Sequence, residues 1–363
     1  MKKYLFIASA ALLALAACSK VNYVEEPDQL IKFNVANYVN STKAQGVVYY
    51  PSASFGSYAF ILPSDQTFDG STSELVKYMD NVEVKLSNGQ WAPVGAYYWP
   101  KQSKLTFASY SPKMADGVAP TYSRAGWAMA SYTAEAHVLD GTDADAAYDL
   151  MFSDVSLSKD CTSETNAGGT TITDDAEEGT TDHGYKGVPT LFRHQLAKVG
   201  LVFQTVPELA APSVTSHEIT INSVKLSSIG KTAAFANNEW GNATETGDYD
   251  YSISSKSLGV ITKETTEVAK TDEVAMILLP QTLTAGAQKL EVEYTLVTKY
   301  GEKSVSEPLT AEIDLVSEAV PAWSINQHIV YTVTIRPFAQ EPIVYDPAVV
   351  NWSAITPGEL TIQ

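Results

Sequence analysis

The chain has very little cysteine. Only Cys18 and Cys161 occur in 363 residues. Cys18 belongs to a leader segment described below, so Cys161 has no intrachain partner and a disulfide-stapled fold is excluded. Cys161 also lies among serine, threonine, glycine and aspartate with no adjacent histidine. We therefore do not expect it to act as a nucleophile.

Catalytic signatures are also missing. The sequence has no G-x-S-x-G elbow, H-E-x-x-H pair, P-loop or Rossmann glycine fingerprint. No two of its five histidines are paired at metal-ligand spacing: His137, His183, His194, His217 and His328. Asp140, Asp143 and Asp145 lack the ordered spacing and final glutamate of a calcium loop, so we interpret them as a solvated loop. The sequence predicts no catalytic site, no metal and no cofactor.

Basic residues are scarce. The chain has 24 lysines and arginines against 42 aspartates and glutamates, which gives a formal net charge of −18. An acidic surface of this size disfavours nucleic acid and anionic lipid headgroups. We therefore expect no nucleic-acid partner, although the charge does not identify any other partner.

The one long apolar run lies at the start of the chain. It extends from Tyr4 to Ala17, follows Lys2 and Lys3, and ends in Leu15-Ala16-Ala17-Cys18. A spanning helix needs about 20 residues, so this run is too short and fits a removable signal better. We predict a lipoprotein signal peptide over residues 1–17, with Cys18 as the acylated residue anchored in the outer membrane. The alternative is an ordinary secretion signal with an incidental cysteine.

Helix signals are weak, whereas strand signals recur. The only helix that we expect is a short one over Ser71–Met79, where Ser71-x-x-Glu74 resembles a capping box. Apolar and polar residues alternate through Val82–Leu86, Leu290–Leu296 and Ile329–Ile335, as in half-buried strands. Asn88-Gly89 after the first run predicts a tight hairpin turn.

Many short strands and few helices indicate an all-β fold of sandwiches or barrels. At about 150 residues per domain, the length fits two sandwiches. A low-complexity stretch over 160–187 predicts a flexible loop, with the domain boundary near 188–200. The expected segments are a lipid-attached segment with the first strand (18–46), an N-terminal sandwich (47–190) and a C-terminal sandwich (191–363).

Several short motifs follow one another in an order that resembles the fimbrillin-like lipoproteins of the Bacteroides group, subunits of type V pili. No single motif is strong, but their order and spacing cover roughly 300 residues. The motifs are Ile31-x-Phe33, Thr42-Lys43-Ala44, Phe55–Phe60, Trp91, Tyr97–Pro100, Leu105–Pro112, Asp149–Met151, Phe192–Val199, Met276–Gln281 and Trp323–Tyr331. The residues themselves suit core and turn positions rather than reactive groups, and we expect Asn326 at a turn that leads into the Ile329–Ile335 strand.

The resemblance implies two tandem transthyretin-like, Greek-key β-sandwiches and a non-enzymatic role in a surface fimbria that supports adhesion. It also implies that a protease removes the N-terminal strand, so that a neighbouring subunit can fill the exposed groove with a donated strand. Family processing is often at arginine, but no arginine lies near the first strand, so Lys43-Ala44 is the expected site. An anchor subunit that keeps its lipid would need no cleavage.

The expected donor segment lies at the C-terminus, with Ile355, Leu360 and Ile362 as its apolar residues, although Pro357 and Gly358 interrupt a regular strand. The expected partners are other pilus subunits, the outer membrane and a host or bacterial adhesion receptor. The alternative function is a surface lipoprotein that binds a glycan or a protein. For that function, the aromatic residues of Tyr97–Pro100 and Phe107–Tyr110 would form a sugar-stacking platform, although such residues more often pack in a sandwich core.

Overall fold

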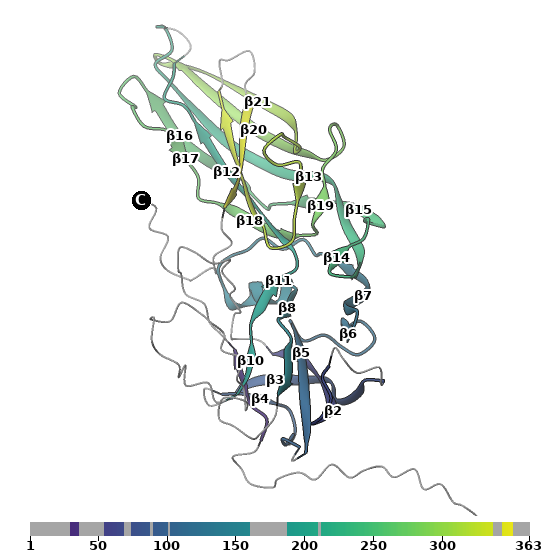
Figure 1. Ribbon diagram of the computed structural model, residues 1–363. Coiled ribbons are helices and arrows are strands. Elements are labelled where there is room, and N and C mark those ends of the chain that lie inside the picture. Colours follow the sequence, from purple (N-terminus) through teal and green to yellow (C-terminus); the bar gives the residue numbers. More distant parts are fainter. Residues whose placement is uncertain are drawn as a thin grey trace, which may run out of the picture.

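A computed structural model describes residues 30–35, 54–68, 74–87, 90–100, 102–159, 187–209, 212–336 and 343–350. The protein is elongated, with the N-terminal strands gathered at one end and most C-terminal strands at the other (Figure 1). The described residues contain no α-helix, and their one regular helical turn is the 3-10 helix η2 (Asp143–Tyr148). None of their helices has the length and apolar character needed to cross a bilayer. The fold is all-β, as predicted.

The described part of the N-terminal half contains a nine-stranded sheet. Eight strands follow one another in space: β10 (Val188–Thr190), β1 (Phe33–Val35), β4 (Gln90–Pro93), β3 (Val76–Ser87), β2 (Phe55–Pro63), β5 (Ser103–Ser111), β8 (Met151–Ser153) and β11 (Phe192–His194). The ninth strand, β9 (Ser156–Lys159), pairs with β5. Strands β3 and β4 are antiparallel on either side of the predicted hairpin turn, whose residues 88 and 89 lie outside the described ones.

The helix predicted over Ser71–Met79 is wrong for its described end, because Val76 begins strand β3. Strand β3 pairs with β2, and this pairing places Met79 opposite Ala59 with its side chain fully buried. Tertiary pairing therefore overrides the local capping signal at Ser71-x-x-Glu74.

The C-terminal half packs two sheets face to face. The first contains β17 (Ala269–Lys270), β12 (Ala197–Thr205), β23 (His328–Ile335) and β24 (Ile343–Val350), with β18 (Val274–Leu278) beside β12. The second contains β21 (Lys303–Asp314), β20 (Lys289–Tyr300), β13 (Ser216–Ala236), β7 (Gly126–Thr133) and β6 (Thr121–Ser123), and β13 also pairs with β14 (Glu239–Trp240), β15 (Glu245–Asp250) and β16 (Lys256–Thr262). A short pair, β19 (Gln281–Thr282) and β22 (Ala322–Trp323), completes the described strands.

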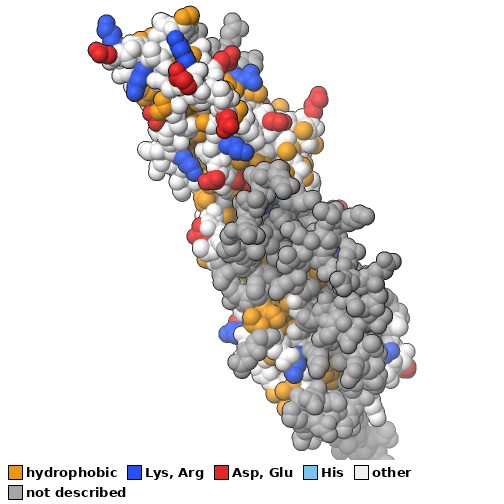
Figure 2. Space-filling model, turned by 90° about the vertical axis from the view of Figure 1, so that its left-hand side faces the viewer, with side chains coloured by type: hydrophobic (Ala, Val, Ile, Leu, Met, Phe, Trp, Pro, Cys, Tyr) orange, Lys and Arg blue, Asp and Glu red, His pale blue; other side chains and the backbone are white. Residues whose placement is uncertain are grey.

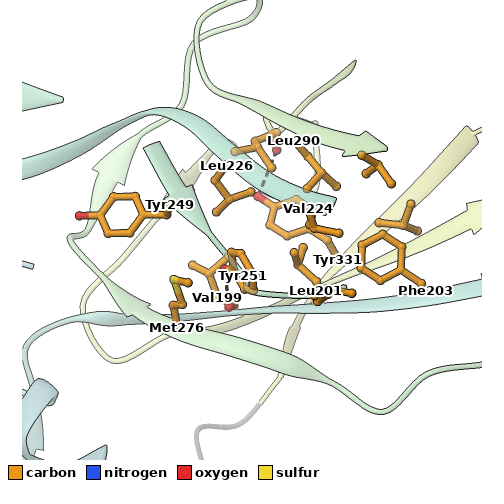
Figure 3. Packing of buried hydrophobic residues seen from close by; sticks show 14 of the residues in the cluster. Val199, Leu201, Phe203, Val224, Leu226, Tyr249, Tyr251, Met276, Leu290 and Tyr331 are labelled. Carbon is orange, nitrogen blue, oxygen red and sulfur yellow. Dashed lines mark hydrogen bonds between the residues drawn. The ribbon is translucent and has the colours of Figure 1, made fainter. Parts of the chain in front are cut away.

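Apolar side chains from both sheets fill the space between them (Figure 3). Val199 and Leu201 of β12 lie in one cluster with Val224 and Leu226 of β13, and all four are fully buried. The alternating runs predicted at Leu290–Leu296 and Ile329–Ile335 form β20 and β23, whose inward residues belong to this cluster. The alternation is therefore confirmed by burial.

Strand β13 connects the two halves of the molecule. Its first part pairs with β20, and its last part pairs with β7, where Phe235 lies opposite Met129. Phe235 also packs edge-on against Phe152 of β8, with 5.2 Å between ring centroids. The N-terminal strands β6 and β7 thus share a sheet with β13, and the boundary near residues 188–200 stays a prediction.

Charged side chains of both signs are interspersed over the C-terminal end on the face shown in Figure 2. The acidic excess of the sequence is therefore not gathered into one negative patch on that part of the visible face. Such mixed surfaces stay soluble without creating a long-range field of one sign.

Candidate functional site

Strand β1 is an interior strand of the N-terminal sheet although it lies near the start of the chain. It pairs in parallel with β10, with Phe33 opposite Val188, and in antiparallel with β4, with Phe33 opposite Trp91. The Val188 amide donates to the Lys32 carbonyl at 2.7 Å, and the Ile31 amide donates to the Tyr97 carbonyl at 2.8 Å. Residues 30–35 are thus held by backbone bonds on both sides.

Alternate side chains of this segment point into the core. Ile31, Phe33 and Val35 are each less than a tenth exposed. Phe33 packs edge-on against Phe55 at 5.5 Å and against Phe107 at 5.7 Å between ring centroids. These contacts follow from the strand repeat, because residues two apart in a strand lie on the same face.

Loss of β1 from this position would leave an open slot. The facing edges of β4 and β10 would lose their partner, and their backbone N–H and C=O groups would need another strand. The apolar floor beneath Ile31, Phe33 and Val35 would also be uncovered. A slot with two free edges and pockets for alternate side chains is the geometry that accepts an added strand.

The residues predicted to act in lipidation, processing and strand donation lie outside the described residues. These residues are Cys18, Lys43, Ala44, Ile355, Leu360 and Ile362. In the sequence, Lys43 and Ala44 fall between β1, which ends at Val35, and β2, which begins at Phe55. A cut at that position would separate β1 from the rest of the chain.

Strand β24 was not anticipated from the sequence. It pairs antiparallel with β23 over eight residues, from His328 opposite Val350 to Ile335 opposite Ile343. Its opposite edge has no neighbour among the described strands, and Val344, Val349 and Val350 are exposed. The β-branched residues on either side of Asp346-Pro347 were the available signal. The proline obscured it because proline is uncommon inside regular strands.

The aromatic motifs form core rather than a platform. Trp99 and Phe107 are buried and pack edge-on at 5.6 Å, while Tyr110 is fully buried. Trp323 is also buried, and its indole N–H donates to the Tyr331 hydroxyl at 2.9 Å. Asn326 has a φ of 60° just before β23, which confirms the predicted turn. Trp99, Phe107 and Tyr110 therefore belong to the core, whereas Tyr97 and Tyr98 of the same motif are half-buried.

The acidic loop is only partly as predicted. Asp140 is exposed, but Asp145 is buried, so the solvated-loop interpretation is wrong for Asp145. One Asp145 oxygen contacts His137 Nε2 at 2.8 Å, and the other accepts the Gly141 amide at 2.9 Å. His194 pairs with Asp149 in a similar way, at 2.6 Å. In the described part of the chain, no three His, Cys, Asp or Glu side chains are placed to hold a metal ion.

An ionic group formed by the buried side chains of Lys198 and His328 with the partly exposed Glu273 supports the start of β12. Glu273 contacts His328 Nε2 at 2.7 Å and Lys198 Nζ at 3.8 Å. Gly200 provides the room, because a Cβ there would lie 2.2 Å from Glu273 Oε1. Burial alone would raise the pKa of Glu273, but the hydrogen bond to His328 and the charge of Lys198 outweigh it and hold that pKa below its usual 4.5. Burial lowers the pKa of Lys198.

We expect Glu273→Gln to lower the free energy of unfolding by about 2 kcal/mol near pH 7, because Lys198 would remain largely buried without its carboxylate. A carboxyl with a lowered folded-state pKa stabilises the protein above its unfolded pKa, and this stability is lost as the pH falls through the folded-state value. The difference between variant and parent in urea unfolding should therefore shrink below about pH 4. Glu267→Gln, at an exposed position, is the control. If the free energies of unfolding of variant and parent differed by the same amount near pH 7 and below about pH 4, this account would be contradicted.

One protein family matches most of the chain. The fimbrillin-like family matches residues 58–352. No curated protein matches the sequence. Solved structures of low similarity align over nearly their whole lengths. A candidate cell adhesion protein from Bacteroides uniformis is 16% identical, with 90% of this chain and 98% of that chain covered and a TM-score of 0.43.

Two further structures extend the comparison. A candidate cell adhesion protein from Bacteroides ovatus is 15% identical, with 89% of this chain and 97% of that chain covered and a TM-score of 0.45. The fimbrial anchor protein Mfa2 from Porphyromonas gingivalis is 13% identical, with 89% and 98% covered and a TM-score of 0.30.

Proposed function

The chain belongs to the fimbrillin-like family, and we propose that it is a structural subunit or anchor of a fimbria assembled by donor-strand exchange. A fimbrial structural or adhesion role, rather than an enzymatic one, follows from the family. The strand-exchange mechanism is our proposal. The observation that carries it is the position of β1, an N-terminal strand inserted between β10 and β4.

In the proposed route, Cys18 carries the lipid that holds the chain at the outer membrane with its sandwiches on the cell surface. Proteolysis between Lys43 and Ala44 then releases the segment that contains β1. Because β1 lies inside the sheet, its release leaves a slot with two backbone edges and an apolar floor. A subunit that is not cut keeps both its lipid and its own strand, as an anchor would.

The donated strand is proposed to come from the C-terminus of a neighbouring subunit. Residues 351–363 follow β24 directly, and Ile355, Leu360 and Ile362 supply apolar side chains. The exposed outer side of β24 supports this proposal, since the chain leaves the C-terminal sandwich from an edge strand and not from its core. The proposed partners are then other subunits of the same fimbria, together with a host or bacterial adhesion receptor that the assembled fimbria would contact.

The experiment is an unboiled gel and intact-mass analysis of protein sheared from the native cell surface. A polymerising subunit should give a detergent-resistant ladder whose bands begin at or near Ala44. Deletion of residues 351–363 should remove the ladder without removing the monomer. Monomers alone from the undeleted chain, with acylated Cys18 retained, would contradict polymerisation and favour a free-standing surface lipoprotein.

A further inference from the structure

Two long strands form free edges of the C-terminal sheets in the described part of the chain. Strand β21 has 12 residues and pairs only with β20, and β24 has 8 residues and pairs only with β23. Each strand therefore has one side on which no described strand shares its backbone hydrogen bonds. A long free edge can pair with a strand of another chain, which leads to uncontrolled association.

Apolar side chains beside both edges add to this tendency. Val305 and Leu309 of β21 and Val349 of β24 are 48%, 36% and 50% exposed. Leu309 lies opposite the buried Tyr294, and Val349 lies opposite the buried Ile329. Because residues opposite each other in an antiparallel pair lie on the same face, the apolar inner faces of both sheets continue past the core to these edges.

Each edge strand contains a proline near its middle. Pro308 of β21 is exposed and lies opposite Thr295, and Pro347 of β24 is half-buried and lies opposite Tyr331. The pairing continues without a register shift on both sides of each proline. A proline inside a paired strand costs a ladder hydrogen bond unless its nitrogen faces away from the neighbouring strand.

Backbone hydrogen bonds fix the direction in which Pro308 faces. The amide of Leu315, just after β21, donates to the carbonyl of Gln288, just before β20, at 3.0 Å. Backbone groups alternate between the two sides of a strand, so the odd-numbered residues of β21 face β20 and the even-numbered residues face the free edge. Pro308 is therefore at an edge-facing position, in one row with Ser306 and Thr310.

Pro347 has the same orientation. The Lys198 amide donates to the carbonyl of Gln327, just before β23, at 2.8 Å, so the odd-numbered residues of β23 face β12. The even-numbered residues, from His328 onwards, then face β24, and they lie opposite its even-numbered residues. The odd-numbered Pro347 therefore directs its nitrogen to the free edge of β24.

We propose that Pro308 and Pro347 keep these two edges from pairing with the same edges of a second copy of this chain, and so restrict the contacts that subunits can make. This proposal goes beyond the fimbrial role and does not depend on strand exchange. A proline has no N–H, so a carbonyl of the incoming strand would be buried without a donor. The proline ring also occupies the place of the missing hydrogen and holds the incoming strand away.

The central position makes one proline sufficient for each edge. On β21, Pro308 divides the edge-facing N–H groups into those of Ser304 and Ser306 on one side and those of Thr310, Glu312 and Asp314 on the other. The edge of β24 is divided by Pro347 in the same way. Pairings over so few residues are marginal in water, so neither half of an edge is expected to hold a strand on its own.

The test is sedimentation velocity of the uncut chain over a range of protein concentrations. The uncut chain keeps β1, so the slot is filled and strand exchange does not contribute. Pro308→Thr and Pro347→Thr should each associate at concentrations about thirtyfold lower than the parent, because paired edges of two copies gain one hydrogen bond from each copy. Threonine suits both positions, since it supplies an N–H and favours strands.

Ser306→Thr is the matched control. Ser306 is exposed and already has an edge-facing N–H, so this variant gains only the strand preference of threonine and should stay as monomeric as the parent. Adding Ser306→Pro to Pro308→Thr moves the missing donor by two residues along the same edge and should reverse the association.

The proposal is overturned if both proline variants associate no more strongly than the parent, if Ser306→Thr associates as strongly as Pro308→Thr, or if Ser306→Pro does not reverse the association. Because the slot is filled in the uncut chain, these results are independent of whether strand exchange occurs.

Discussion

A chain cut between Lys43 and Ala44 and freed of its N-terminal segment is expected to be much less stable than the intact chain and to bind the apolar dye ANS. The reason is the burial of Ile31, Phe33 and Val35. Burial of each such side chain contributes up to about 1.5–3 kcal/mol, so together they supply a large part of the stability of a domain. Urea unfolding and ANS fluorescence measure the two effects.

The control for this experiment is the same cut chain before the N-terminal segment is separated from it. That nicked protein keeps β1 in place and should behave like the intact chain. If the freed chain unfolded at the same urea concentration as the nicked one and bound no ANS, β1 would not be a structural strand and the slot would not exist.

Gly56→Ala should lower the free energy of unfolding by about 3 kcal/mol, because the new Cβ has no space. It would lie 2.2 Å from Cε1 and 2.4 Å from Cζ of Tyr110, which pairs with Gly56 across β2 and β5. Tyr110 is fully buried, and its hydroxyl donates to Asn81 Oδ1 at 2.5 Å, so the ring cannot move without losing that bond. Thermal or urea unfolding provides the measurement.

Gly241→Ala is the matched control, since its Cβ would meet nothing closer than 3.5 Å. It should change stability by well under 1 kcal/mol. The double variant Gly56→Ala/Tyr110→Leu should lose less free energy of unfolding than the two single variants lose in sum, because removing the ring removes the clash. Simple additivity would show that Tyr110 is not the cause.

Local sequence patterns predict a strand when one of its faces is buried whichever strands it pairs with. The alternation through Leu290–Leu296 identifies β20 because one face of that strand is buried wherever it pairs. The Asn326 turn was predicted from its place before the β23 run, and the positive φ confirms it. The all-β class followed from many such runs and from the near absence of helix signals.

Partnership between distant segments could not be predicted in the same way. The interior place of β1 depends on residues 188–190, more than 150 positions away along the chain. The helix predicted over Ser71–Met79 is wrong at its described end because Met79 pairs with Ala59 of β2 in a sheet. Nothing in the sequence distinguishes Gly56 from other glycines. Only the pairing register shows that the Tyr110 ring fills the space that a side chain at position 56 would need.

The sequence also cannot distinguish a sugar platform from a core. The consecutive aromatic residues of Tyr97–Pro100 suit either role, and the burial of Trp99 follows only from the pairing of distant strands.

We propose that the slot of β1 accepts a strand from another subunit, and the most direct test is the binding of a peptide of residues 343–363 to the chain freed of residues before Ala44. We predict a stable complex that restores the urea midpoint and abolishes ANS binding, whereas a peptide with serine at Ile355, Leu360 and Ile362 should fail to do so. If the peptide of residues 30–43 rebinds and the C-terminal peptide does not, the slot serves only its own strand and donor-strand exchange through this segment is contradicted.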